Sequence, residues 1–363
     1  MKFRTSKENL LTAIQKVQSV ITAKSVLPIL SNILIETQGN NLSLTATDLD
    51  IGISCLIPVN ILEQGSVTVP AKRFGDIIKE LPSDDVMVNI KKNNQVTIDT
   101  GSCQFKILGL PAEEFPKLPE FKDKEVIKIS QQGLKHMLSL TSFAVSFDET
   151  RYILNGILFK IHKNKLTLVA TDGKRLAVAE GTLAKETDKD VRIIIPLKTI
   201  QELNRNLKED AEVSLILGNN QVLFDLGGVV IISRLIEGEF PDYNQVIPAA
   251  SESKMTVERE KFLLAVRRAA LLSTPDYQAV KLEFFKDKLV VSKSTPDVGE
   301  SREELQVQYR GKEMVIGFNP VYLLDVLKNL NMEQAELEVT DSEKPGVMRA
   351  NGYTYVVLPM RLS

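Results

Sequence analysis

The feature that most constrains this chain is an internal repeat with a period near 124 residues. Three segments read as a strand that runs directly into an amphipathic helix, and the junction residues are Pro70, Pro196 and Asn319, which lie 126 and 123 residues apart. Proline is favoured where a helix begins because the N–H that it lacks would have no partner there, and asparagine is a good helix cap. One structural plan is therefore used three times.

Two further landmarks recur at this spacing. Leu42–Asp48 matches Leu166–Asp172, 124 residues later, and Leu289–Ser294 is a weaker third copy. The string Glu114-Phe115-Pro116 returns as Glu239-Phe240-Pro241 after 125 residues. Several matches at one period predict a triplicated domain of about 120 residues. The predicted domains are 1–125, 126–252 and 253–363.

Each repeat reads as an α+β domain with two helices on one side of antiparallel sheet. In the first helix, Leu10, Ile14 and Val17 fall on one helical face. Between the helices, alternation such as that of Val86–Ile90 predicts strands, and Asn93-Asn94 predicts a turn. The predicted helices are Lys7–Val20, Ala71–Glu80, Gln131–Ala144, Leu197–Lys208, Val257–Leu272 and Asn319–Leu330.

Composition excludes several classes of protein. Lys and Arg number 45 against 47 Asp and Glu, so a uniformly basic nucleic-acid coat is excluded. The two cysteines, Cys55 and Cys103, cannot form a disulfide framework, and the two histidines, His136 and His162, leave little material for a zinc site. The sequence contains no run of about 18 apolar residues. We expect a cytoplasmic, multidomain protein without a cofactor or a metal.

The charge is unevenly distributed along the chain. The six predicted helices sum to +7 and the remaining residues to -9. Because the apolar stripe of each helix faces inward, we expect the charges on the exposed helix faces. Helices gathered on one side would then attract a polyanion, while the sheets would repel it. The alternative is a solvated helix surface that binds nothing.

The chain resembles the bacterial β sliding clamp family, the processivity subunit of the replicative DNA polymerase. Matching strings follow the family order along the whole chain: Leu27–Leu30, Leu44–Leu49, Arg151–Gly156, Ala170–Leu176, Phe240–Tyr243 and Leu358–Leu362. The resemblance implies a homodimeric ring of six domains, with antiparallel sheets outside and helices lining a hole for duplex DNA. It implies no catalysis, and partners that include the DNA polymerase III α subunit, the clamp loader and other replication and repair proteins.

A ring that encloses DNA needs only weak phosphate contacts without base readout. Ile153 stands where many relatives have a second aromatic residue after Tyr152. The DNA contacts that the resemblance implies are Lys24, Arg73, Arg151, Tyr152 and Lys198.

The resemblance also implies a subunit interface. Phe105 and Ile107 of an edge strand in the first domain would face Leu271 and Leu272 in the third domain of the other chain. Apolar residues on an edge strand invite pairing with another chain. Packing of these residues inside their own domain is equally compatible with the sequence.

A third implied site is an apolar pocket between the second and third domains that binds a short partner peptide. We expect Met360 and Leu362 to form its wall with Leu176, Pro241 and Val246, so that deleting Met360–Ser363 abolishes peptide binding. Gln245, Tyr277 and Glu343-Lys344-Pro345 depart from many relatives. The implied pocket residues are Leu154, Thr171, Gly173, Lys174, Arg175, Leu176, Pro241, Val246, Tyr322, Val356, Val357, Pro359, Met360, Arg361 and Leu362.

Two other hypotheses remain open. One is a hydrolase that uses Asp48, Asp50 and His136, although Asp172-Gly173 at the equivalent place of the next repeat indicates a turn. No hydrolase elbow, phosphate-binding loop or dinucleotide fingerprint follows any predicted strand. The other is a clamp paralogue that serves repair, which the sequence does not separate from a replication clamp.

Overall fold

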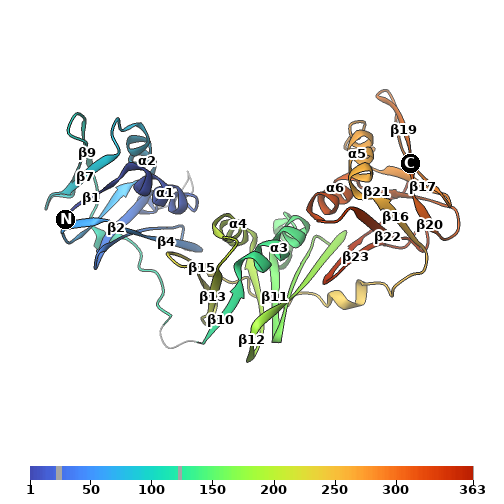
Figure 1. Ribbon diagram of the computed structural model, residues 1–363, viewed down its shortest axis with the longest axis horizontal. Helices are drawn as coiled ribbons and strands as arrows, with labels where there is room; N and C mark the ends of the chain where they lie inside the picture. The colour runs from blue at the N-terminus through green and yellow to red at the C-terminus, as the bar shows by residue number, and fades with distance from the viewer. Residues whose placement is uncertain (22–26, 122–124, 363) are drawn as a thin grey trace. The chain divides into compact units, whose positions relative to one another are not determined.

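The computed structural model describes residues 1–21, 27–121 and 125–362 and contains three copies of one α+β plan (Figure 1). All six predicted helices are present, with ends that differ from the prediction by a few residues. The helices are α1 (Lys7–Gln18), α2 (Ala71–Glu80), α3 (Gln131–Thr141), α4 (Leu197–Asn206), α5 (Arg259–Ala270) and α6 (Pro320–Asn329).

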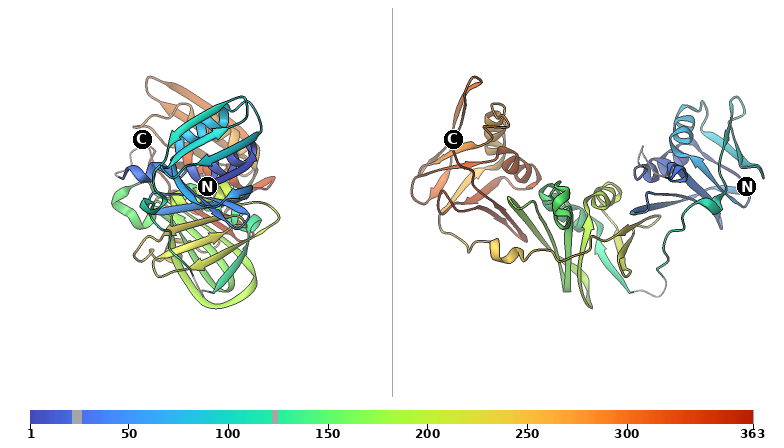
Figure 2. Two further views of the ribbon diagram at one scale, coloured as in Figure 1. Left: turned by 90° about the vertical axis from the view of Figure 1, so that its left-hand side faces the viewer. Right: turned by 180° about the vertical axis from the view of Figure 1, so that it is seen from behind.

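Local capping explains where the helices begin. The Ser6 hydroxyl accepts a hydrogen bond from Asn9 N at the start of α1, and the Asn319 side chain accepts one from Val321 N at the start of α6. The helix predicted from Val257 begins two residues later, because Met255 and Val257 are buried on one face of a strand. In the first and third repeats the two helices lie side by side (Figure 2).

In the part of the chain that the structure describes, the strands form four antiparallel sheets. The first has the order β5 (Asn60–Glu63), β1 (Lys2–Ser6), β7 (Asp85–Ile90), β8 (Gln95–Asp99) and β9 (Gln104–Leu108). The second has the order β10 (Val126–Ser130), β13 (Glu212–Leu217), β14 (Gln221–Asp225), β15 (Val229–Arg234), β4 (Ile51–Pro58), β3 (Asn41–Thr47), β2 (Asn32–Gln38) and β6 (Ser66–Pro70).

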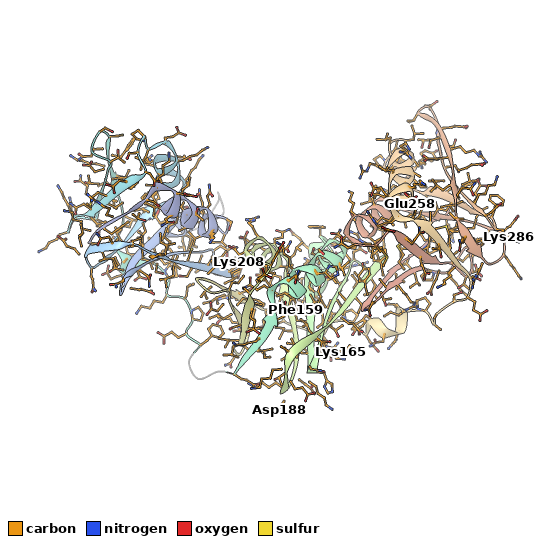
Figure 3. The ribbon with its side chains drawn as sticks, in the orientation of Figure 1. Phe159, Lys165, Asp188, Lys208, Glu258 and Lys286 are labelled. Atoms are coloured by element: carbon orange, nitrogen blue, oxygen red, sulfur yellow. The ribbon has the colours of Figure 1, made fainter. Side chains whose placement is uncertain are left out.

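The other two sheets are built from residues that follow Asn155. The third has the order β11 (Gly156–Thr171), β12 (Arg175–Pro196), β24 (Tyr353–Val357), β23 (Gly346–Ala350), β22 (Gln334–Glu338), β16 (Lys254–Glu258) and β20 (Gln308–Arg310). The fourth has the order β19 (Gly299–Gln306), β18 (Lys288–Thr295), β17 (Val280–Phe284) and β21 (Met314–Phe318). On the long β11–β12 hairpin, Phe159 is fully buried, whereas Lys165 and Asp188 point outward (Figure 3).

Two sheets cross from one repeat to the next. Strand β4 of the first repeat pairs with β15 of the second, and β12 of the second pairs with β24 of the third. The chain forms two compact units, Met1–Gln132 with Lys198–Leu235 and Gly133–Leu197 with Ile236–Ser363. Each shared sheet lies within one unit, so hydrogen-bonded strands join consecutive repeats.

The Thr-Asp landmark forms the same turn in two repeats. In Thr47-Asp48 the Asp48 carboxylate accepts hydrogen bonds from the N–H groups two and three residues later, and Thr171-Asp172 repeats this pattern. The following residue has a left-handed backbone in both turns, with φ of 80° at Leu49 and 85° at Gly173. The repeated string therefore encodes a backbone turn.

One charged residue departs from the prediction that helix charges are exposed. Glu202 on α4 is 4% exposed. Its carboxylate accepts hydrogen bonds from Ser19 Oγ at 2.6 Å and Arg205 Nη1 at 2.9 Å. These partners compensate for the burial of the charge.

Candidate functional site

An apolar cavity of about 400 Å³ opens in the second unit beside the Asp172 turn. Buried side chains of the core, among them Val169, Val178 and Val347, support it from beneath. Residues from two sequence repeats therefore build one cavity. Its lining residues are Leu154, Thr171, Gly173, Lys174, Arg175, Leu176, Phe240, Pro241, Asp242, Tyr243, Val246, Pro345, Val356 and Leu358.

The structure brings most of the predicted pocket residues to this cavity. The predicted residues that line it are Leu154, Thr171, Gly173, Lys174, Arg175, Leu176, Pro241, Val246 and Val356. Tyr322 lies against the Arg175 side chain, and Val357 is fully buried. Sequence reasoning missed Phe240, Asp242, Tyr243, Pro345 and Leu358 as lining residues, although the string Phe240–Tyr243 had already been singled out.

The position of the C-terminal segment corrects the sequence-based expectation. Pro359, Met360, Arg361 and Leu362 line a neighbouring cavity of about 690 Å³ beside β21, and not the cavity that holds Leu176. Met360 N donates to the Gly317 carbonyl at 2.8 Å, so the segment continues along the edge of the four-stranded sheet. A Cβ at Gly317 would lie 2.7 Å from the Met360 carbonyl oxygen, so glycine permits this approach.

Arg175 is the one strongly buried charge in the cavity wall, at 8% exposure. Its Nε donates to Asp172 Oδ2 at 3.0 Å and its Nη1 to Asp325 Oδ2 at 2.7 Å. Burial acts to lower the pKa of Arg175, but the Asp325 hydrogen bond and the charges of Tyr355 and Asp172 raise it above its ordinary value. The guanidinium therefore stays charged beneath an apolar surface.

The rim of the cavity carries charges of both signs. Side-chain hydrogen bonds from Gln245 and Asn244 lower the pKa of Asp242, with help from the Asn244 backbone N–H. Lys174, on the Asp172 turn, also lines the cavity, and its side chain is exposed. The arrangement is a hydrophobic slot with a polar mouth, which suits an extended peptide with apolar anchors.

Two predicted DNA contacts lie in the first unit. Arg73 is exposed on α2. Lys198, at the start of α4, forms an ion pair with Asp48 and donates to the Val20 carbonyl at 3.2 Å. Lys198 is therefore partly neutralised, whereas Arg73 presents its charge to solvent.

Two other predicted contacts lie in the second unit, on the 3-10 segment Glu149–Leu154. The Arg151 side chain is 58% exposed and 3.8 Å from the Asp148 carboxylate, and Tyr152 is 57% exposed. Arg151 and Tyr152 belong to the second unit, whereas Arg73 and Lys198 belong to the first. Lys24 lies outside the described residues.

The predicted interface residues differ in exposure. Phe105 on β9 is 37% exposed, and Leu271, at the end of α5, is 79% exposed. Ile107 is 7% exposed because it faces the same side as the buried Val96 of β8. Ile107 therefore packs in its own sheet, which is the alternative that the sequence left open. Leu272 is half-buried.

Two residues of the hydrolase hypothesis, Asp48 and Asp50, make structural contacts. Asp48 caps its turn and pairs with Lys198, and Asp50 lies 3.7 Å from the Arg234 guanidinium. Both belong to the first unit and His136 to the second. Among the described residues, no group of three or more His, Cys, Asp or Glu side chains is placed to hold a metal ion. This arrangement gives the hydrolase hypothesis no support.

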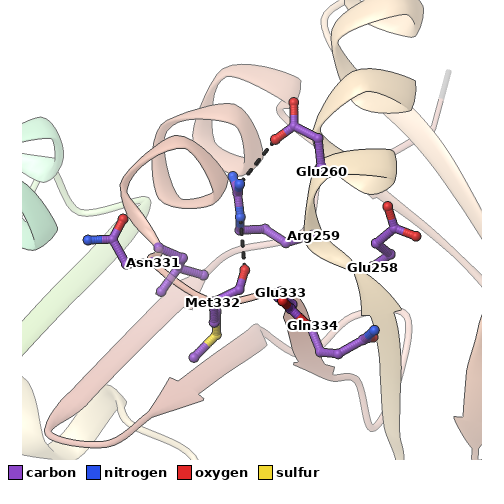
Figure 4. Close-up of a pocket in the computed structure, with 8 residues that line it drawn as sticks. Glu258, Arg259, Glu260, Asn331, Met332, Glu333 and Gln334 are labelled. Carbon is purple, nitrogen blue, oxygen red and sulfur yellow. Dashed lines mark hydrogen bonds and ion pairs between the residues drawn. The ribbon is translucent and has the colours of Figure 1, made fainter.

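A larger cavity of about 620 Å³ lies where α6 ends and α5 begins (Figure 4). Arg259 donates to the Leu327 carbonyl at 2.8 Å and the Met332 carbonyl at 3.0 Å, and its Nη2 lies 3.1 Å from Glu260. These contacts satisfy carbonyls at the end of α6. Arg259 thus has a structural role, which the sequence did not predict.

None of the helices in the described ranges is long and apolar enough to cross a membrane.

Family models match the chain in three consecutive parts. They are the DNA polymerase III β subunit N-terminal domain over residues 1–119, the central domain over 128–242 and the C-terminal domain over 244–361. The beta sliding clamp of Chlamydia muridarum is 34% identical over 363 residues, covering 100% of this chain and 99% of that protein. That of Pseudomonas putida is 35% identical over 368 residues, covering 100% of both.

Solved structures agree over the same length. The DNA polymerase sliding clamp from Bacillus subtilis has a TM-score of 0.95 at 32% identity, with 100% of both chains covered. The DnaN sliding clamp from Pseudomonas aeruginosa bound to griselimycin has a TM-score of 0.95 at 34% identity, again with 100% of both chains covered. The chain therefore belongs to the bacterial DNA polymerase III β subunit family, the β sliding clamps.

Proposed function

We propose that this chain is a DNA sliding clamp that closes into a homodimeric ring around duplex DNA and tethers the replicative polymerase in the cytoplasm. The observation that carries the proposal is the match to all three clamp domains, in order, over the whole chain. The proposed domains are 1–125, 126–252 and 253–363. The activity is mechanical, since enclosure and tethering require no bond to be made or broken.

The repeat itself supports the dimer. Strand β15 ends the second repeat and pairs with β4 of the first, and β24 ends the third repeat and pairs with β12 of the second. In both cases the last strand of one repeat joins the strand after the Thr-Asp turn of the repeat before it. By this rule, β9 is the last strand of the first repeat, and β19 is the strand of the third repeat that corresponds to β4 and β12. Among the described residues, neither strand has such a partner.

These two strands are edges of their sheets. If the rule that joins repeats within the chain also joins chains, β9 of one chain pairs antiparallel with β19 of another. A second such contact closes a two-chain ring. The half-exposed Phe105 on β9 and the exposed Leu271 then supply the apolar contact.

The excess charge of the helices supports weak DNA contact. A surplus of +7 on the helices and a deficit elsewhere suits non-specific attraction to phosphates. Arg73, Arg151 and Tyr152 are exposed as such a contact requires, and Lys198 contributes a partly neutralised charge. The weak contact lets an enclosed duplex slide.

The apolar cavity supports peptide tethering. Its aliphatic lining and polar mouth fit a short linear segment of the polymerase α subunit, the clamp loader or a repair protein. We therefore propose that griselimycin, to which the solved Pseudomonas aeruginosa clamp is bound, also binds this chain, and that it does so in the apolar cavity described above.

Enclosure of DNA predicts topology-dependent retention. The purified chain, loaded onto nicked circular DNA by a bacterial clamp loader, should remain bound in salt that disrupts phosphate contacts and should leave when the circle is cut once. The measurement is co-elution with DNA in gel filtration before and after cleavage. Cleavage of a second plasmid in the same tube is the control. Equal retention on circular and linear DNA would contradict enclosure.

A further inference from the structure

The Arg175 side chain connects the cavity wall to a helix that does not line the cavity. Its guanidinium donates to Asp172 on the turn and to Asp325 on α6, at 3.0 and 2.7 Å. Asp325 is absent from the cavity lining, and its side chain is 25% exposed. Arg175 is therefore the side chain that links Asp325 to the cavity.

Aromatic rings enclose the same guanidinium. Its carbon lies 4.4 Å from the centre of the Tyr322 ring and 5.5 Å from that of Phe143, and Nη2 donates to the Phe143 carbonyl. The Tyr355 hydroxyl donates to the Tyr322 carbonyl at 2.9 Å, which fixes that part of α6. A buried cation is stable only while its acceptors stay in place.

We propose that Asp325 is a positioning residue of the peptide site, which acts through Arg175 and never touches the ligand. The inference rests on the proposed function. With Asp325 in place, the guanidinium is drawn toward α6 and away from the cavity. Without that carboxylate, the side chain keeps Asp172, the Phe143 carbonyl and the Tyr322 ring but loses its charged partner on α6. Its route to water then leads through the cavity that it lines, where a charge competes with an apolar ligand.

The test is a double-mutant cycle on the full-length chain with griselimycin as the probe. Asp325→Asn keeps the side-chain shape and removes the charge, and it should weaken griselimycin binding about tenfold in calorimetry, because a neutral amide oxygen holds the Arg175 guanidinium less strongly than a carboxylate does. The control Lys328→Gln changes one exposed charge on the same helix and should leave affinity unchanged. In an Arg175→Gln background, Asp325→Asn should have no further effect.

An unchanged affinity in Asp325→Asn, or effects of the two substitutions that simply add, would overturn the proposal. Amide hydrogen exchange of the free protein separates this outcome from failure of the proposed function. The N–H groups of Lys174 and Arg175 both donate to Asp172 Oδ1. An Arg175 side chain that has lost its charged partner on α6 holds Asp172 less firmly, so these two N–H groups should exchange faster in Asp325→Asn. Faster exchange in a chain that does not bind griselimycin would refute the peptide site and keep the Asp325–Arg175 link; unchanged exchange would refute the link.

Discussion

At the scale of single residues, two buried tyrosines on β24 make the second unit sensitive to alkali. The Tyr353 hydroxyl donates to the Leu140 carbonyl at 3.0 Å, and that of Tyr355 to the Tyr322 carbonyl at 2.9 Å. Burial raises the pKa of both phenols above 10.0. The folded chain therefore keeps protons that the unfolded chain releases, so stability falls as pH rises through the ordinary tyrosine range.

Replacing Tyr355 by Phe should reduce this alkaline loss. We expect the free energy of unfolding to fall less steeply above pH ~10, by about 1.4 kcal/mol per pH unit for one proton. At neutral pH the lost hydrogen bond should cost about 1 kcal/mol. Urea unfolding of the second unit between pH 8 and pH 11 measures both effects. The exposed Tyr152→Phe is the control, and an unchanged alkaline slope in Tyr355→Phe would contradict the assignment.

The two copies of the Thr-Asp turn differ at the left-handed residue, and this difference has opposite consequences for substitution. Leu49 holds φ of 80° at a position where Gly173 holds 85°. A left-handed backbone costs a side chain of this kind about 1–2 kcal/mol. Leu49→Gly should therefore stabilise the first unit by about 0.5–1 kcal/mol, after the added entropy of unfolded glycine is counted.

Gly173→Ala should destabilise the second unit by about 1 kcal/mol or more, because a left-handed backbone with φ of 85° strains any side chain. Thermal melts of both variants provide the measurement. A lower melting temperature for Leu49→Gly would show that the turn does not strain Leu49.

At the scale of elements, the periodicity of apolar residues predicted the helices and strands that bury one apolar face. The helices appeared because an apolar stripe must face a core, and the strand predicted at Val86–Ile90 appeared as β7 (Asp85–Ile90) with alternate residues buried. The sequence did not show which side of the edge strand β9 faces inward, since Phe105 and Ile107 are both apolar. It also did not show that Met360 pairs with Gly317, because that register is fixed by tertiary contacts.

The proposed pairing of β9 with β19 predicts a mass near 81 kDa, twice the 40.5 kDa of one chain. Phe105→Asp combined with Leu271→Asp should shift the protein to monomer, since each apolar anchor contributes about 2 kcal/mol and its loss weakens association about thirtyfold. Sedimentation at micromolar concentration gives the mass. Leu62→Asp, on β5 at the opposite edge of the same sheet, is the matched control. A monomeric unsubstituted chain would exclude the ring.

At the scale of the whole molecule, sequence repeats and compact units divide the chain differently. The sequence predicts three domains, whereas the compact units place Lys198–Leu235 with the first repeat. The reason is the pairing of β15 with β4, which adds strands of the central repeat to the sheet of the first. Sequence similarity identifies the repeats, whereas hydrogen bonds and packing define the compact units.

The pairing of β4 with β15 and of β12 with β24 has a kinetic consequence for a ring built from this chain. Strands on one polypeptide stay at a high effective concentration after they separate, so these junctions reclose at once. The β9–β19 contacts join separate polypeptides and lack that tether. Four of the six junctions would therefore reclose readily after they separate, whereas the two between chains would reclose more slowly. A loader that passes DNA into the ring would act on one of these two.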